Sequence, residues 1–216
     1  AGWHKLPLPD KQNIMFADFR RDPDQYPLKT PSGKIEVFSS TVASFAYDDC
    51  LGHPAWFAPP EWLGAAEDTY PLHLLSNQPR TKLHSQLDQG PVAAAAKIKG
   101  REEVQMHKDD AAARGIEEGD IIRLFNARGA IYVGVRITAK IKHGVVMVPT
   151  GAWLDLDKDD PELCKHGNPN MLAPDRPTSK LAQGPAAHSC LVQAEAVDQT
   201  RLPEVTAFIP PVIEKG

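Results

Sequence analysis

The chain has 216 residues, a formal net charge of −4, 42% hydrophobic residues and 24% charged residues. This is the composition of a globular protein that is long enough for one sizeable core, or for one domain with a long extension. The charge gives no general attraction for nucleic acid or an anionic membrane, and no apolar run approaches the roughly 18 residues that span a bilayer. We therefore expect neither a nucleic-acid partner nor a membrane partner.

The first residues, AGWHKLPLPDKQ, contain no positive region followed by an apolar stretch, so they predict no signal peptide. The chain begins without Met, which we interpret as a processed chain or a piece of a longer one. Residues 1–69 show little periodicity and predict an extended, proline-rich arm. Within it, KIEVF at 34–38 alternates as a short strand does, after the turn signal TPSG. The stretch HPAWFAPPEWLG at 53–64 predicts a strap that buries its aromatic side chains, Trp56, Phe57 and Trp62, against a larger surface.

From residue 70 onward the pattern is one of short strands joined by glycine turns. Strands are predicted at 72–75, 104–107, 120–126, 130–138, 145–149 and 189–197. Between the second and the third, DDAAARG predicts a short helix that is capped by Asp109 or Asp110 and closed by Gly115 in a left-handed conformation. We predict a mainly β fold in which a six-stranded barrel with short helices spans residues 70–198 and a tail spans 199–216.

Two cysteines and two histidines form a C-x-H … H-x-C pattern: Cys164, His166, His188 and Cys190. These are zinc-binding residue types, but structural zinc pairs usually have two to four residues between ligands, and here each pair has one. We therefore predict no metal site and interpret the cysteines as small buried residues or barrel neighbours, with a disulfide between them left open. Cys50 and His53 lack the companion motifs of a nucleophile–base pair, so we predict no catalytic residue in this chain.

Three motifs occur in one order along the chain: TPSGKIEVFS with YDDCLGHPAW, then SNQPRTKLHSQL, then HGNPNMLAPDRPTSKLAQG. Together with AAARGIEEGDIIRLFNARGAIYVGVRIT they resemble the C-terminal domain of the molybdenum bis-(molybdopterin guanine dinucleotide) oxidoreductases. The branch is that of the dimethyl sulfoxide, trimethylamine N-oxide and biotin sulfoxide reductases. The resemblance implies that the barrel is a double-psi β-barrel.

In that family the matching domain is the last of four, so the resemblance implies a fragment or subunit whose partners are the upstream domains of the same enzyme. It implies molybdopterin guanine dinucleotide with molybdenum as the cofactor of the full-length enzyme, and an S-oxide or N-oxide as its substrate. We expect the isolated chain to hold no cofactor. The chain has no CxxC run for an iron–sulfur cluster and no residue matching the family's molybdenum ligand. The compartment stays open, because the family contains both periplasmic and cytoplasmic enzymes.

The resemblance also implies which residues bind the cofactor. A pterin edge alternates donors and acceptors, which side-chain amides can match, and glycines let the backbone approach a flat ligand. In the middle motif the candidates are Gln78, Arg80, Thr81, His84, Ser85 and Gln86. In the last motif they are Gly167, Asn168, Asn170, Gln183 and Gly184. We favour Asn170 over Asn168. Arg80 and Lys82 could supply charge to the pyrophosphates, or could belong to a solvated loop.

A second interpretation is a non-catalytic double-psi barrel that acts as a protein-interaction module. The two differ in what they predict for the face formed by residues 76–86 and 166–184. A cofactor-binding barrel leaves this face open and polar, whereas an interaction module has no reason to carry these amides and glycines and can fill it with its own apolar side chains.

Overall fold

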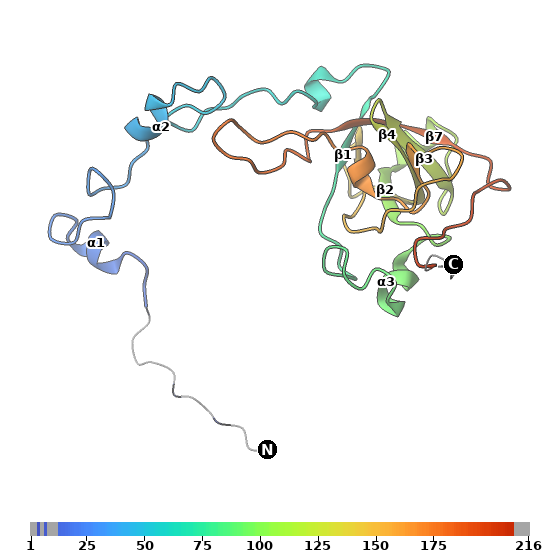
Figure 1. The fold of residues 1–216 in the computed structure, drawn as a ribbon, viewed down its shortest axis with the longest axis horizontal. Helices are drawn as coiled ribbons and strands as arrows, with labels where there is room; N and C mark the ends of the chain where they lie inside the picture. The colour runs from blue at the N-terminus through green and yellow to red at the C-terminus, as the bar shows by residue number, and fades with distance from the viewer. Residues whose placement is uncertain (1–3, 5–6, 8–12, 210–216) are drawn as a thin grey trace, which may run out of the picture. The chain divides into compact units, whose positions relative to one another are not determined.

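The computed structural model of the protein describes residues 4, 7 and 13–209 (Figure 1). The chain divides into two compact units, Ala1–Phe57 and Ala58–Gly216. The predicted boundaries at 69/70 and 198/199 stay predictions. None of the helices in the described ranges is both long and apolar enough to cross a membrane.

The first unit contains two short helices, α1 (Ala17–Arg21) and α2 (Ser40–Ser44), joined by turns. Ser39 caps α2, because its hydroxyl accepts the backbone N–H of Val42. Residues 34–38 form no strand. A side chain of the preceding TPSG turn forms a hydrogen bond with the backbone here instead of a neighbouring strand. The hydroxyl of Thr30 donates to the carbonyl of Lys34 at 2.6 Å.

The second unit is built around six strands whose pairing closes on itself. In chain order they are β1 (Leu72–Leu75), β2 (Glu103–His107), β3 (Ile121–Asn126), β4 (Gly129–Thr138), β5 (Val145–Met147) and β7 (Leu191–Ala196). Their spatial order is β2-β5-β1-β7-β3-β4, and β4 pairs with β2 again, which completes the ring. The short β6 (Leu163–Cys164) adds to the edge of β4. All six predicted barrel strands are present, with ends that differ by one or two residues.

Two pairs in this ring are parallel, β1 with β5 and β2 with β4, and the other four are antiparallel. Both parallel pairs join strands that are separated in the chain by other barrel strands, so each connection crosses the ring. This is the double-psi β-barrel that the family resemblance implies. Parallel pairing also means that the segments following β1 and β5 leave the barrel at the same end.

The barrel core follows the alternation that the strand sequences show. Along β2, Val104 and Met106 are fully buried while the residues between and beside them are half-buried. The long strand β4 has buried residues on both faces between Gly129 and Val135, and a short helix, η2 (Pro169–Met171), contacts it. The largest fully buried apolar side chains are Leu72, Leu74, Met106, Ile121, Ile122, Leu124, Ile131, Leu172, Val104, Val133 and Val135.

The second unit has three further short helices: η1 (Leu63–Ala65) precedes β1, α3 (Pro91–Ala96) lies between β1 and β2, and α4 (Lys108–Ala112) follows β2. The cap of α4 differs from the prediction, because the imidazole of His107 accepts the N–H of Asp109. Asp110 is instead buried and accepts the N–H of Gly144 at 2.8 Å, which ties the helix to the turn before β5. The left-handed closure at Gly115 is confirmed, with φ of +62°.

The predicted burial of the strap's aromatic side chains is not provided by the described residues. Trp56 is 74% exposed, Phe57 47% and Trp62 36%. The prolines of this stretch keep it free of strands, and its helical structure is limited to η1.

Candidate functional site

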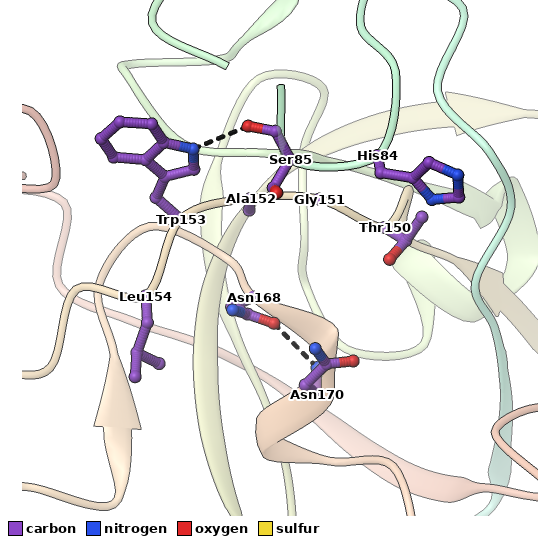
Figure 2. Close-up of a pocket in the computed structure, with 9 residues that line it drawn as sticks. All are labelled: His84, Ser85, Thr150, Gly151, Ala152, Trp153, Leu154, Asn168 and Asn170. Atoms are coloured by element: carbon purple, nitrogen blue, oxygen red, sulfur yellow. Dashed lines mark hydrogen bonds between the residues drawn. The ribbon is translucent and has the colours of Figure 1, made fainter. Parts of the chain in front are cut away.

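A cavity of about 510 Å³ opens between three segments of the second unit (Figure 2). One segment follows β1, one follows β5 and one follows β6. The first two meet because β1 and β5 are parallel neighbours. The residues that line the cavity are His84, Ser85, Thr150, Gly151, Ala152, Trp153, Leu154, Asn168 and Asn170. No Asp, Glu, Lys or Arg is among them, so the cavity is polar but carries no fixed charge.

The first two segments touch through their backbones. Gly151 has φ of +94°, and a β-carbon at this position would stand 1.8 Å from the carbonyl oxygen of His84. The indole N–H of Trp153 donates to the carbonyl of Ser85 at 2.7 Å, as the dashed line in Figure 2 shows. Only glycine allows this approach and this φ together. The glycine of PTGAW, at 149–153 after β5, is the sequence signal for this contact, and it was not among the predicted site residues.

The third segment contains Asn168 and Asn170, whose side chains differ in their hydrogen bonds. The side-chain oxygen of Asn168 accepts the backbone N–H of Asn170 at 3.0 Å and so caps η2. The side-chain amide of Asn170 is exposed and makes no hydrogen bond to any described residue. In Figure 2 both asparagines lie across the cavity from the Ser85–Trp153 pair. Asn170 therefore has a free donor and a free acceptor at the cavity.

The structure brings four of the predicted site residues together at this cavity: His84, Ser85, Asn168 and Asn170. Gln78 lies beside them, since its amide nitrogen is 3.2 Å from Nδ1 of His84. Gly167, with φ of +93°, is buried directly behind Asn168, where a β-carbon would come within 3.1 Å of neighbouring atoms.

The other predicted residues lie outside the cavity lining. Arg80, Thr81 and Gln86 belong to the same loop as His84 but do not line the cavity. Gln183 and Gly184 belong to a turn that is closed by a bridge between Pro177 and Pro185. This turn is part of the long loop drawn in orange in Figure 1.

Lys82 is not part of a solvated loop. Its side chain is 1% exposed, and its ammonium group pairs with Asp88 at 2.6 Å and with Glu102. Burial would lower the pKa of Lys82, but the hydrogen bonds that its ammonium group donates to these two carboxylates outweigh burial and raise the pKa above its ordinary value. Lys82 is therefore occupied inside the protein and does not face a ligand.

The residues of the C-x-H … H-x-C pattern have separate structural partners. Cys190 is fully buried and donates from its thiol to the carbonyl of Leu172, and burial raises its pKa to about 11. Nδ1 of His188 accepts the N–H of Ser76 at 3.4 Å. Cys164 is a buried residue of β6 and is not in a disulfide. Across the described residues, no three side chains of the metal-ligating types gather at one point.

The fold is a double-psi β-barrel, and the cavity at its end is lined by uncharged side chains that include two asparagines. Within that class, the chain belongs to the molybdopterin dinucleotide-binding domain family, whose model matches residues 72–191.

Relatives in this family are similar over nearly the whole chain. The chain is 43% identical over 204 residues to the trimethylamine-N-oxide reductase of Haemophilus influenzae, which covers 93% of this chain. It is 46% identical over 187 residues to the biotin sulfoxide reductase of Cereibacter sphaeroides, which covers 86% of this chain. The match takes up 25% of the length of each of these two relatives, so the chain spans about a quarter of the curated relatives that it matches.

Among solved structures, acetylene hydratase from Pelobacter acetylenicus superposes with a TM-score of 0.66 at 19% identity. The superposition covers 82% of this chain and 25% of that one. At this level of identity the likeness establishes the fold.

Proposed function

We propose that the chain binds molybdopterin guanine dinucleotide at the cavity lined by His84, Ser85, Asn168 and Asn170, as one part of an S-oxide or N-oxide reductase. The observation that carries this proposal is the free side-chain amide of Asn170 at the cavity. An amide offers a donor and an acceptor side by side, which suits the alternating edge of a pterin or a guanine. Once a ligand covers this amide, it needs partners, and the heterocycle supplies them.

The fit of the cavity to a flat heterocycle rests on three of its features. Its volume of about 510 Å³ is in the range of small-molecule sites. Its lining combines the apolar side chains of Trp153 and Leu154 with amide, hydroxyl and imidazole groups. It has no charged side chain to attract a phosphate. We therefore assign the cavity to a heterocyclic part of the cofactor and leave Arg80 and Thr81, in the adjoining loop, as candidates for the pyrophosphate.

When bound, the cofactor supplies the two-electron redox chemistry that removes an oxygen atom from an S-oxide or N-oxide. The residues of this chain bind and orient it. Asn170 donates to and accepts from the heterocycle edge, and Ser85 and Thr150 offer hydroxyl groups beside it. Gln183 and Gly184 are proposed to contact the cofactor outside the cavity. We assign no catalytic residue and no molybdenum ligand to this chain.

The partners proposed for the chain are the other domains of the same enzyme. The relatives are about four times as long as the matched region. Large apolar side chains are exposed here, among them Phe38, Trp56 and Leu83 at 56%, 74% and 61%. Such exposure suits surfaces that other domains cover. A barrel that served only as an interaction module would share this exposure, but it would not need an open cavity with the free amide of Asn170 in its lining.

The proposal is tested in a chimera. This chain replaces the matching quarter of the Escherichia coli trimethylamine-N-oxide reductase, which is 46% identical to it over 187 residues. The pterin and molybdenum bound per protein are then measured for the chimera and for its Asn170→Ala and Asn168→Ala variants. We expect the Asn170 variant to lose most of the bound pterin at unchanged melting temperature, because its side chain makes no hydrogen bond to any residue that the structure describes. An Asn170→Ala chimera that folds and retains its full pterin content would contradict the proposed contact between Asn170 and the cofactor.

A further inference from the structure

Behind the cavity lies a buried cluster of four charged side chains: Lys82, Asp88, Lys97 and Glu102. They are between 0% and 7% exposed. Each lysine contacts both carboxylates: Lys97 lies 2.8 Å from Asp88 and 3.2 Å from Glu102, and Lys82 pairs with the same two groups. Two positive and two negative charges cancel, so the cluster is neutral. It joins the loop after β1 to the end of α3 and the start of β2.

Asp88 belongs to this cluster and also reaches the cavity wall. One of its carboxylate oxygens, Oδ1, accepts from both ammonium groups. The other, Oδ2, accepts the backbone N–H of Trp153 at 3.0 Å. The same oxygen lies 3.8 Å from Nδ1 of His166. Asp88 is fully buried, so these contacts are made without water around them.

Three polar atoms of Trp153 have hydrogen-bond partners, and Asp88 is one of these partners. Its N–H donates to Asp88, its carbonyl oxygen lies 3.0 Å from Nδ1 of His166, and its indole N–H donates to Ser85. The ring of Phe208 packs edge-on against both the indole and the imidazole, at centroid distances of 5.3 and 5.1 Å. Trp153 and Ser85 both line the cavity, so this arrangement fixes two of the cavity's walls against each other.

We propose that Asp88 is a positioning residue for the cavity: by accepting from the two lysines on one side and from Trp153 on the other, it fixes the distance between the 84–85 and 150–154 walls. The inference rests on the proposed function only where it treats the cavity as a ligand site. Asp88 does not line the cavity and is assigned no contact with a ligand.

A carboxylate is needed here because it can accept on both sides. An asparagine at position 88 has one acceptor oxygen and one NH2 group. The charge-assisted bond to an ammonium group is the stronger of the two available, so the oxygen faces the lysines. The NH2 group then faces the N–H of Trp153, two donors meet, and the bond to Trp153 is lost.

The test uses the 216-residue chain labelled with 15N and compares Asp88→Asn with Asp110→Asn. Asp110 is a matched control: it is also buried, accepts a backbone N–H and lies 3.7 Å from an arginine, Arg114, but none of its described partners lines the cavity. The readouts are the backbone and indole N–H signals of Trp153 and their hydrogen-exchange rates. In a sample labelled with 15N at tryptophan alone, both signals are assigned by their loss in Trp153→Phe. Both aspartate variants should lower the melting temperature, so stability alone does not distinguish them.

We expect Asp88→Asn to shift both Trp153 signals and to speed their exchange by about tenfold or more, and Asp110→Asn to leave both unchanged. If Asp88→Asn fails to fold, Asp88→Asn with Lys82→Met retains a neutral cluster and should show the same shifts. Unchanged Trp153 signals in either folded variant would overturn the proposal. The measurement needs no ligand, so a cavity that binds no pterin would defeat the proposed function and leave this result standing.

Discussion

Gly151 and His84 approach each other so closely that no other residue fits at position 151. A β-carbon there would stand 1.8 Å from the carbonyl oxygen of His84, and the φ of +94° disfavours side chains independently. This contact joins the loop after β1 to the segment after β5 at the cavity. The parallel pairing of those two strands and this backbone contact together place the cavity at one end of the barrel.

Replacing Gly151 with alanine should therefore be costly. The left-handed conformation costs about 1–2 kcal/mol in a residue with a side chain. Forcing the two backbones apart adds about 1–3 kcal/mol. We expect a loss of about 2–5 kcal/mol of unfolding free energy, measured by urea denaturation.

The control for this prediction is Gly115→Ala. Gly115 also has a positive φ, +62°, but a β-carbon there would meet nothing within 4 Å. Only the conformational cost of about 1–2 kcal/mol should appear. Equal losses for the two variants would mean that the contact with His84 contributes nothing.

The thiol groups should differ in reactivity. Cys164 and Cys190 are fully buried, and burial raises the pKa of Cys190 to about 11, whereas Cys50 is half-buried. Because the thiolate is the reactive form, a disulfide reagent at a pH of about 8 should modify one thiol per folded chain, at Cys50. In denaturant it should modify all three. Rapid labelling of Cys190 in the folded chain, seen by peptide mass spectrometry, would contradict this account of the barrel.

Stability should depend on pH through His166. Burial, followed by the positive charge of Lys97, holds the pKa of His166 below its ordinary value of 6.5. When the pH falls through about 6.5, the unfolded chain takes up a proton that the folded chain does not, so the unfolding free energy decreases. The His166→Asn variant, whose amide can still donate to Trp153, should show a shallower decrease between about pH 7 and 5. An identical slope in urea denaturation of both proteins would show that His166 is not the cause.

Asp88 should also make the unfolding free energy decrease as the pH falls, but at lower pH than His166. Burial alone would raise the pKa of Asp88, but hydrogen bonds from Lys82, Lys97 and the Trp153 N–H hold the pKa below its ordinary value of 3.8. The stability that this carboxylate provides is present above about pH 4 and is lost as the pH falls through the folded-state pKa. Acid unfolding of Asp88→Asn should therefore be less steep below about pH 4 than that of the unaltered chain. Equal steepness would contradict this.

The barrel could be predicted because its strands carry their own signal. β1 and β2 alternate buried and half-buried residues along their whole length, β3 does so from its second residue, and glycines mark several of the turns. The KIEVF stretch at 34–38 has the same alternation but forms no strand. Alternation is necessary for a half-buried strand, but a strand also needs a neighbour to pair with, and a sequence does not show its pairing.

The site could be predicted only in part, for a similar reason. The two motifs that resemble a known family led to His84, Ser85, Asn168 and Asn170, all of which line the cavity. The wall at Thr150–Leu154 depends on the parallel pairing of β1 with β5, which joins segments about 70 residues apart. The burial of Lys82 likewise depends on Asp88 and Glu102 meeting in space. From the sequence alone, a lysine in a polar loop is predicted to be exposed to solvent, because its buried partners are known only from the structure.

The two asparagines should separate folding from binding. Asn168 uses its side chain to cap η2, so Asn168→Ala should lower the unfolding free energy by about 0.5–2 kcal/mol. Asn170→Ala should leave it unchanged, because this side chain bonds to no described residue. Urea denaturation of the two variants checks both expectations. A destabilised Asn170→Ala would show that its side chain serves the fold.

The most direct test of the central claim is the amount of pterin retained by the chimera described above when Asn170 is replaced by alanine. We predict that the folded Asn170→Ala chimera loses most of its bound pterin while its melting temperature stays that of the parent chimera. Asn168→Ala should lower the melting temperature of the chimera, because it removes the cap of η2. Full pterin content in Asn170→Ala would contradict the claim that the free amide at this cavity binds the cofactor.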